Sequence, residues 1–193
     1  DWFNTTNKRS KFIKMRKILK VDRFKEIMEK QLSLQKKEIR LKEKKEAFLK
    51  TILSKNKNSM NKYKRVPCSP IRYAGGKTLA GGHVIELLPN NVKRVISPFF
   101  GGGSIEIAMS KYLDLEVRGY EIFDILCNYW KFQIENPKLL YEELKKLKPN
   151  KEQFEKIRKI LNKVWKKEIT LDPLTLAVYY VYNFNLSYGP GFM

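Results

Sequence analysis

The sequence predicts an α/β fold that opens as a parallel βαβ unit. Val95-Ile96 forms a β-favouring run inside residues 92–100, and the glycines of "GGGS" follow directly. Apolar residues then recur at helical spacing over 105–112, and residues 115–122 alternate as in a second strand. A strand, a glycine loop, a helix and a second strand in this order are typical of a parallel sheet with helices packed on it.

The segments after the second strand are predicted to be helical. Residues 124–147 are helical material that Pro137 interrupts, and residues 138–169 form a lysine-rich pair of helices. Asp172 and Pro173 predict the start of a further helix, because aspartate is favoured at the N-cap and proline at the first helical position.

The first sixty residues form a distinct basic segment. Residues 1–62 hold 20 Lys and Arg against 7 Asp and Glu, and residues 21–55 contain neither Gly nor Pro. We therefore expect one or two long helices, with a broken apolar stripe at Val21, Phe24, Met28, Leu32, Ile39, Phe48 and Ile52. Three roles fit such a helix: a DNA-backbone arm, a partner helix, or a solvated helix packed on the main domain. Residues 54–64 are polar like a linker, so the expected parts are 1–60, 61–137 and 138–193.

The composition points to a polyanionic partner. Over 193 residues, 40 Lys and Arg against 20 Asp and Glu give a formal net charge of +20, which favours nucleic acid over a membrane surface. Cys68 and Cys127 lack a CxxC spacing and predict reduced thiols in a cytoplasmic protein. His83 is the only histidine, which excludes a multi-histidine metal site. No apolar run approaches the ~20 residues that span a bilayer.

The stretch "SPIRYAGGKTLAGG" at 69–82 contains "GGKT" and raises the question of a P-loop. A P-loop needs a first glycine where this chain has Ile71. Pro67 and Pro70 also interrupt the approach, where a β-strand would be required. We therefore exclude a phosphate-binding P-loop, and Lys77 needs another explanation.

The glycine loop and Glu121 together predict a nucleoside-bearing cofactor. Free N–H groups at a helix start can bind a ligand, and glycines let it approach the backbone closely. Glu121 ends the second strand about 18 residues beyond the loop, where a carboxylate can bind the two hydroxyls of a ribose. The pattern GGG disfavours a dinucleotide and suits S-adenosylmethionine, whose amino-acid end would lie over the loop. The alternative is that the glycines form a tight turn that serves packing alone and binds no ligand.

Four segments resemble, in order and spacing, the Dam-like family of DNA adenine methyltransferases. They are "IRYAGGKT", "ISPFFGGGSIEIAMS", "GYEIFDILCNYWKFQIENPKLLYEELKKL" and "LAVYYVYNFNLSYGPGF", and the resemblance covers about residues 63–193. It implies a Rossmann-like S-adenosylmethionine methyltransferase sheet, incomplete in this chain, and a helical insert that begins the DNA-recognition region.

The resemblance also implies a set of cofactor-binding residues. Lys77 would direct its ammonium at the cofactor carboxylate, Glu121 would hold the ribose, and Ile122 would pack on the adenine. The other contacts would come from the two glycine-bearing turns, through Tyr73, Ala74, Gly75, Gly76, Phe99, Gly101, Gly103 and Ser104.

The chain departs from the family pattern at several positions. Ser97 stands where the family usually has an acidic residue that meets the cofactor's ammonium. Glu121 replaces an aspartate, and the two residues between Glu121 and Asp124 are one fewer than in the common family pattern. The catalytic signature, Asp-Pro-Pro-Tyr, is absent, and we interpret residues 172–175 as a helix cap. The order of the motifs predicts the signature beyond Met193, on a continuation or on a second chain, so no catalytic or metal-binding residue is assigned.

The resulting hypothesis is a site-specific DNA adenine methyltransferase of bacterial or phage type, such as those of restriction-modification systems. Methyl transfer would run from S-adenosylmethionine to the exocyclic amine of adenine in double-stranded DNA, and this chain would carry the cofactor-binding part. Basic residues in 1–65 and 138–167 would contact phosphates. The alternative is a non-catalytic, basic nucleic-acid-binding protein that keeps a degenerate methyltransferase half.

Overall fold

The computed structural model describes residues 2–55, 60–66, 69–71, 73 and 75–187, and their side chains from residue 22 onward. The elements are α1 (Trp2–Ile52), α2 (Gly81–Leu87), β1 (Arg94–Ser97), α3 (Ser104–Leu113), β2 (Glu116–Gly119), α4 (Asp124–Glu135), α5 (Pro137–Lys145), α6 (Lys151–Trp165) and α7 (Pro173–Leu186). The described residues thus form a mixed α/β structure with seven helices and a two-stranded sheet. Among them, no helix has both the length and the apolar character needed to cross a bilayer.

The two strands pair in parallel, as the sequence predicts. Ser97 lies opposite Gly119, and α3 forms the crossover between the strands. Two bonds continue the pairing past the strand ends: the Tyr120 N–H donates to the Ser97 carbonyl (2.8 Å), and the Phe100 N–H donates to the Tyr120 carbonyl (2.9 Å). The sheet therefore fixes both the start of the glycine loop and the position of Glu121.

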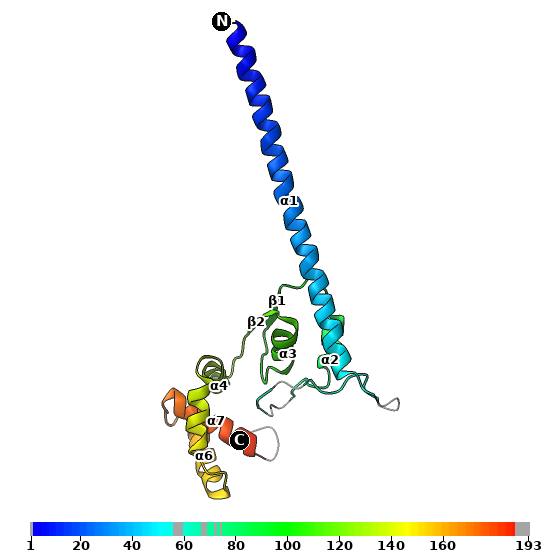
Figure 1. Ribbon diagram of the computed structural model, residues 1–193. Helices are drawn as coiled ribbons and strands as arrows, with labels where there is room; N and C mark the ends of the chain where they lie inside the picture. The colour runs from blue at the N-terminus through cyan, green and yellow to red at the C-terminus, as the bar shows by residue number, and fades with distance from the viewer. Residues whose placement is uncertain (1, 56–59, 67–68, 72, 74, 188–193) are drawn as a thin grey trace.

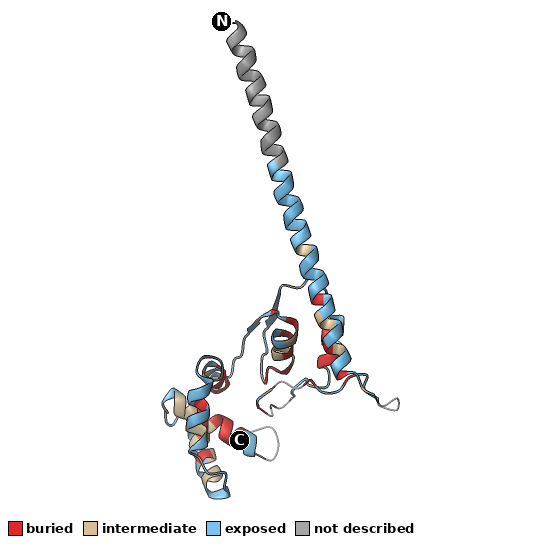
Figure 2. Ribbon diagram, viewed as in Figure 1, coloured by how far each residue is buried: buried red, intermediate tan, exposed pale blue. Residues whose placement is uncertain are grey.

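The basic N-terminal segment is a single helix, α1, that projects from the rest of the molecule (Figure 1). Its described side chains are almost all exposed as far as Arg40, and burial begins at Leu41 (Figure 2). The predicted apolar stripe divides accordingly: Phe48 and Ile52 are 5% exposed, whereas Phe24, Met28, Leu32 and Ile39 remain at least half exposed. Only the C-terminal part of α1 therefore contributes to a core.

The sequence does not predict α2, because this helix begins with two glycines, which disfavour helical structure. A Cβ at Gly81 would lie 2.5 Å from Val66 Cγ2, and one at Gly82 would overlap the ring of Tyr63. Glycine at these positions lets α2 pack closely on the chain that returns from α1. Tyr63 also forms a bridge with Leu53, so the expected linker folds back on the end of α1.

Helices α4 to α7 form a second half of the molecule around their own core (Figure 1). Its almost fully buried side chains are Leu126, Tyr129, Ile157, Leu161 and Tyr180. Pro137 begins α5, and Asp172 Oδ1 accepts a hydrogen bond from the Thr175 N–H (3.0 Å), which confirms Asp172 as the N-cap of α7. A separate hydrophobic cluster joins α1, α2, α3 and the strands. The two halves meet at the glycine loop.

Candidate functional site

A cavity of about 490 Å³ lies where the two glycine-bearing turns meet. Nine of the eleven residues expected to bind a cofactor line it: Tyr73, Gly75, Gly76, Lys77, Phe99, Gly101, Gly103, Ser104 and Glu121. Ala74 lies outside the described residues. Ile122 is 96% exposed and does not line the cavity. The structure thus brings together three segments that are far apart in the sequence.

The glycine loop requires glycine for two separate reasons. Gly101 and Gly103 have φ values of +50° and +62°, in the left-handed region that favours glycine, and the Gly103 N–H donates to the Phe100 carbonyl (2.8 Å). A Cβ at Gly101 would also lie 2.9 Å from the ring of Tyr73, so the loop packs directly on the other turn. The loop therefore serves packing and also lines the cavity.

Glu121 ties the glycine loop to the start of α4. Its Oε2 accepts a hydrogen bond from the Gly101 N–H (2.8 Å), and its Oε1 accepts from the N–H groups of Ile122 (2.9 Å) and Phe123 (3.1 Å). A carboxylate offers about four acceptor positions, so one remains for a ligand donor. Burial raises the pKa of the Tyr73 phenol, and the nearby Glu121 charge raises this pKa further.

Trp130 supports the loop from α4, and sequence reasoning did not identify it. Its Nε1–H donates to the Gly101 carbonyl (2.8 Å), and its ring meets that of Phe100 edge-on at 5.1 Å between centroids. Phe100 in turn covers Gly119, where a Cβ would overlap the phenyl ring. The sequence feature that could have identified Trp130 is its position on the apolar face of α4, one turn beyond Leu126.

Charges of both signs border the cavity. Lys77 Nζ donates to the Gly75 carbonyl (2.6 Å), which holds this exposed ammonium beside its own turn. Glu106, in the first turn of α3, accepts a hydrogen bond from Ser97 Oγ (2.7 Å) and lines the cavity. Sequence reasoning noted Ser97 as a missing acid and overlooked Glu106. The available signal was an acidic residue in the first helical turn after the glycine loop.

The exclusion of a P-loop has a structural counterpart. The described residues just before Gly75 contain no strand, unlike the approach to a P-loop. Within the described chain, no group of His, Cys, Asp and Glu side chains is arranged to hold a metal ion. Cys127 is an exposed free thiol that donates to the Glu121 carbonyl (3.2 Å), and Cys68 lies outside the described residues.

A comparison with protein families agrees with the resemblance seen in the sequence. The D12 class N6 adenine-specific DNA methyltransferase family matches residues 73–190, more than half of the chain. The matched region contains the glycine loop, Glu106, Glu121 and all of α4 to α7. No curated protein and no solved structure matches the chain.

Proposed function

The chain belongs to the D12 class N6 adenine-specific DNA methyltransferase family, and we propose that it carries the S-adenosylmethionine-binding part of such an enzyme. One observation carries the proposal: both glycine-bearing turns, Lys77, Glu106 and Glu121 line the same cavity. Its volume of about 490 Å³ is in the range of roughly 300–1,000 Å³ usual for small-molecule sites. We further propose that β1 and β2 belong to a Rossmann-like methyltransferase sheet, with the chain divided near residues 60 and 137.

The donors and acceptors of the cavity fit each part of S-adenosylmethionine. The methionine end carries a carboxylate and an ammonium, which the charges of Lys77 and Glu106 complement. The ribose hydroxyls are donors for the remaining acceptor position of Glu121. Ile122, exposed directly after Glu121, stays the proposed contact of the adenine ring.

Glu106 is the part of this assignment that the sequence alone did not suggest. Ser97 occupies the position at which the resembling enzymes usually have an acid, and a serine hydroxyl cannot neutralise an ammonium. Its hydroxyl instead donates to Glu106 at 2.7 Å and orients a carboxylate from the neighbouring helix. Glu106 therefore replaces the missing acid as the group that meets the cofactor's ammonium.

The proposed reaction is methylation of the exocyclic amine of adenine in duplex DNA. The cofactor supplies an activated methyl group on its sulfonium. The amine lies inside the base stack, so the adenine must be flipped out to be reached. The Asp-Pro-Pro-Tyr-type motif that would receive the base is not among these 193 residues, and we propose a continuation or a second chain as its source. The present chain would bind and orient the methyl donor.

Calorimetric titration with two ligands tests the proposal. S-adenosylmethionine carries the amino-acid end, and 5′-methylthioadenosine lacks it. Lys77→Ala and Glu106→Gln should each weaken binding of S-adenosylmethionine about tenfold or more and leave methylthioadenosine unaffected, because removal of a charge-assisted bond costs about 1.5–3 kcal/mol. Lys111→Ala and Glu135→Gln remove the same charges from side chains that do not line the cavity, and they serve as controls.

The outcomes distinguish a failure of the whole cofactor site from a failure of one residue's role in it. If neither ligand binds while DNA does, the cofactor site is contradicted and the non-catalytic nucleic-acid-binding alternative is favoured. If S-adenosylmethionine binds equally well to the wild type and to Glu106→Gln, only the role of Glu106 is contradicted.

A further inference from the structure

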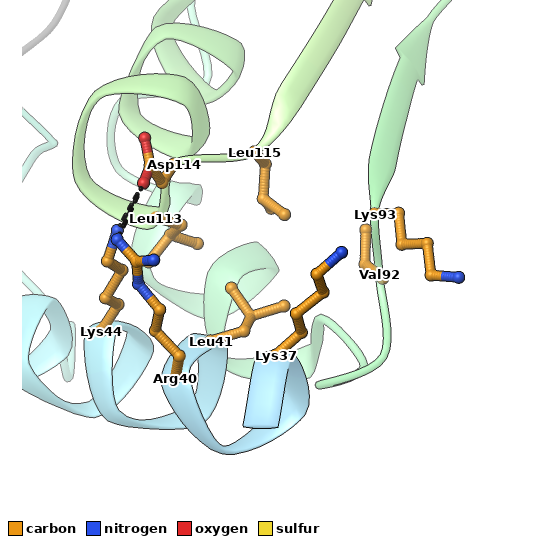
Figure 3. A pocket seen from close by; sticks show the side chains of 9 residues that line it. All are labelled: Lys37, Arg40, Leu41, Lys44, Val92, Lys93, Leu113, Asp114 and Leu115. Carbon is orange, nitrogen blue, oxygen red and sulfur yellow. Dashed lines mark hydrogen bonds and ion pairs between the residues drawn. The ribbon is translucent and has the colours of Figure 1, made fainter. Parts of the chain in front are cut away.

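A second cavity, of about 310 Å³, lies between α1 and the βαβ unit (Figure 3). Lys37, Arg40 and Lys44 line it from α1, at spacings of three and four residues that put them on one helix face. Lys93 lines it from the chain before β1, and Asp114 from the end of α3. None of these residues lines the first cavity, at the glycine loop.

The charges around this cavity do not cancel. Asp114 accepts hydrogen bonds from Lys44 Nζ (2.8 Å) and Arg40 Nη2 (3.4 Å), and the bond from Lys44 lowers the pKa of Asp114. Lys37 and Lys93 form no ion pair within the described part of the chain. Four cations and one carboxylate therefore border the cavity, and the ammonium groups of Lys37 and Lys93 have no anionic partner there; the Lys93 side chain is directed away from Asp114 (Figure 3).

The segment of α1 beside this cavity carries an excess of positive charge. Residues 36–45 contain six Lys and Arg and two Glu. Residues 22–35, further out along the same exposed helix, contain three Lys and Arg and three Asp and Glu. The segment that meets the sheet is thus more basic than the one directly outside it, while residues 2–21 are basic again, with seven Lys and Arg and no Asp or Glu.

The shape and lining of the cavity favour a polymer over a single anion. Leu41, Leu113 and Leu115 are no more than 7% exposed and give the cavity an apolar floor beneath its charged rim. Lys37 and Lys44 are seven residues apart, which is about 10 Å along the helix axis. A row of this length can meet more than one phosphate of a DNA strand, whose charges recur about every 3.4 Å of the duplex axis.

We propose that this cavity binds the sugar–phosphate backbone of DNA, outside the target base. The cations would contact successive phosphates, and the apolar floor would accept the deoxyribose between them. Such a contact adds affinity and orientation without reading sequence. The proposal rests on DNA as the substrate of this family and is independent of cofactor binding.

Fluorescence anisotropy of a labelled duplex, titrated with the full chain from about 50 to about 200 mM salt, tests the proposal. The variant Lys37→Ala/Lys93→Ala should lower the slope of log K against log salt by about one for each phosphate that it no longer neutralises. The control Lys42→Ala/Lys50→Ala removes the same charge from exposed residues of α1 that do not line the cavity, and it should lower the slope by less than half as much.

A second variant at the same cavity should have the opposite effect on DNA binding. Asp114→Asn should tighten DNA binding and steepen the salt slope, because it releases Arg40 and Lys44 for phosphate. Asparagine tolerates the φ of +62° that Asp114 adopts, so the fold should be kept. Weaker or unchanged binding by Asp114→Asn would overturn the proposal, as would equal slopes for the two double variants. Binding of inorganic phosphate at the cavity, with DNA affinity unchanged in Lys37→Ala/Lys93→Ala, would assign it to a free anion instead.

Discussion

Glu121 accepts three backbone hydrogen bonds and lines the cavity at the glycine loop at the same time. Replacing it with alanine would remove the acceptor for the N–H groups of Gly101, Ile122 and Phe123. A change in ligand affinity would then follow from a disturbed loop as well as from the missing carboxylate. Glutamine keeps the shape and one oxygen acceptor, so it is the sharper substitution.

We expect Glu121→Gln to lower the free energy of unfolding by about 1–2 kcal/mol, because an amide group meets N–H donors that faced a carboxylate oxygen. The substitution should also weaken the binding of S-adenosylmethionine and of methylthioadenosine to the same extent, since both ligands carry the ribose. Urea unfolding and calorimetry measure the two effects. Retained affinity for both ligands would mean that Glu121 holds the loop and does not contact the cofactor.

Gly119 has a role that only the folded chain explains. A Cβ at this position would overlap the ring of Phe100, which packs edge-on against Trp130. Gly119→Ala should therefore cost about 1–3 kcal/mol of stability through overpacking, and it should loosen the glycine loop. Urea unfolding measures the cost, and fluorescence quenching of Trp130, with Trp2 and Trp165 replaced by phenylalanine in both proteins, monitors the loop. An unchanged unfolding midpoint would show that Phe100 can move without loss.

The residues of the site were predictable to different degrees. Gly101, Gly103 and Glu121 follow from a local pattern, because a loop between a strand and a helix needs glycines and the next strand ends nearby. Glu106 and Trp130 act through partners that lie 9 and 29 residues away in sequence. Composition and spacing do not report such contacts, so these two roles became visible only in the structure.

At the scale of elements, α7 depends on a capping residue that the sequence predicts correctly. Asp172 accepts a hydrogen bond from the Thr175 N–H, and Asp172→Ala should cost about 1 kcal/mol while Asp172→Asn should cost less. Chemical denaturation of the three proteins at neutral pH measures the difference. An equal loss for Ala and Asn would indicate that the charge, and not the cap, stabilises α7.

The same cap gives a pH dependence with a definite sign. The bonds to Thr175 lower the pKa of Asp172 below its ordinary value of 3.8, so the ionised form is bound better in the folded state. This stability is present above the unfolded-state pKa and is lost as the pH falls through the folded-state pKa. Asp172→Asn should lose less stability than the wild type between neutral pH and the acid range, and urea midpoints along that range would show it.

Some elements can be predicted from their own residues, and others form only because of contacts with a distant segment. Local sequence patterns predict β1, α3 and β2, because the spacing of apolar residues in each element shows which of its faces packs on a core. The helix α2 escapes prediction because its glycines oppose helix locally and are required by Val66 and Tyr63, from another segment. The end of the predicted linker is fixed in the same way, by the bridge between Leu53 and Tyr63.

For the molecule as a whole, the sequence does not reveal which part of the basic N-terminal segment belongs to the fold. Both halves of α1 have apolar residues at helical spacing, and the difference lies in what they meet. Phe48 stacks on Tyr112 of α3 at 4.5 Å between centroids, while Phe24 and Met28 are at least half exposed. The structure thus supports a helix anchored at one end, which leaves its exposed part free for other contacts.

This division makes a prediction that the two ends of α1 respond differently to mutation. Deletion of residues 1–35 removes turns that project from the body (Figure 1) and retains both Leu41 and the cations of the second cavity, so the free energy of unfolding should change by less than about 0.5 kcal/mol. Phe48→Ala should cost about 3–5 kcal/mol, because it empties a core position between α1 and α3. Urea unfolding followed by circular dichroism, corrected for the helix removed, compares the two. A large loss on deletion would mean that the outer turns of α1 contact the body, and a small loss for Phe48→Ala would mean that α1 is not anchored through this core.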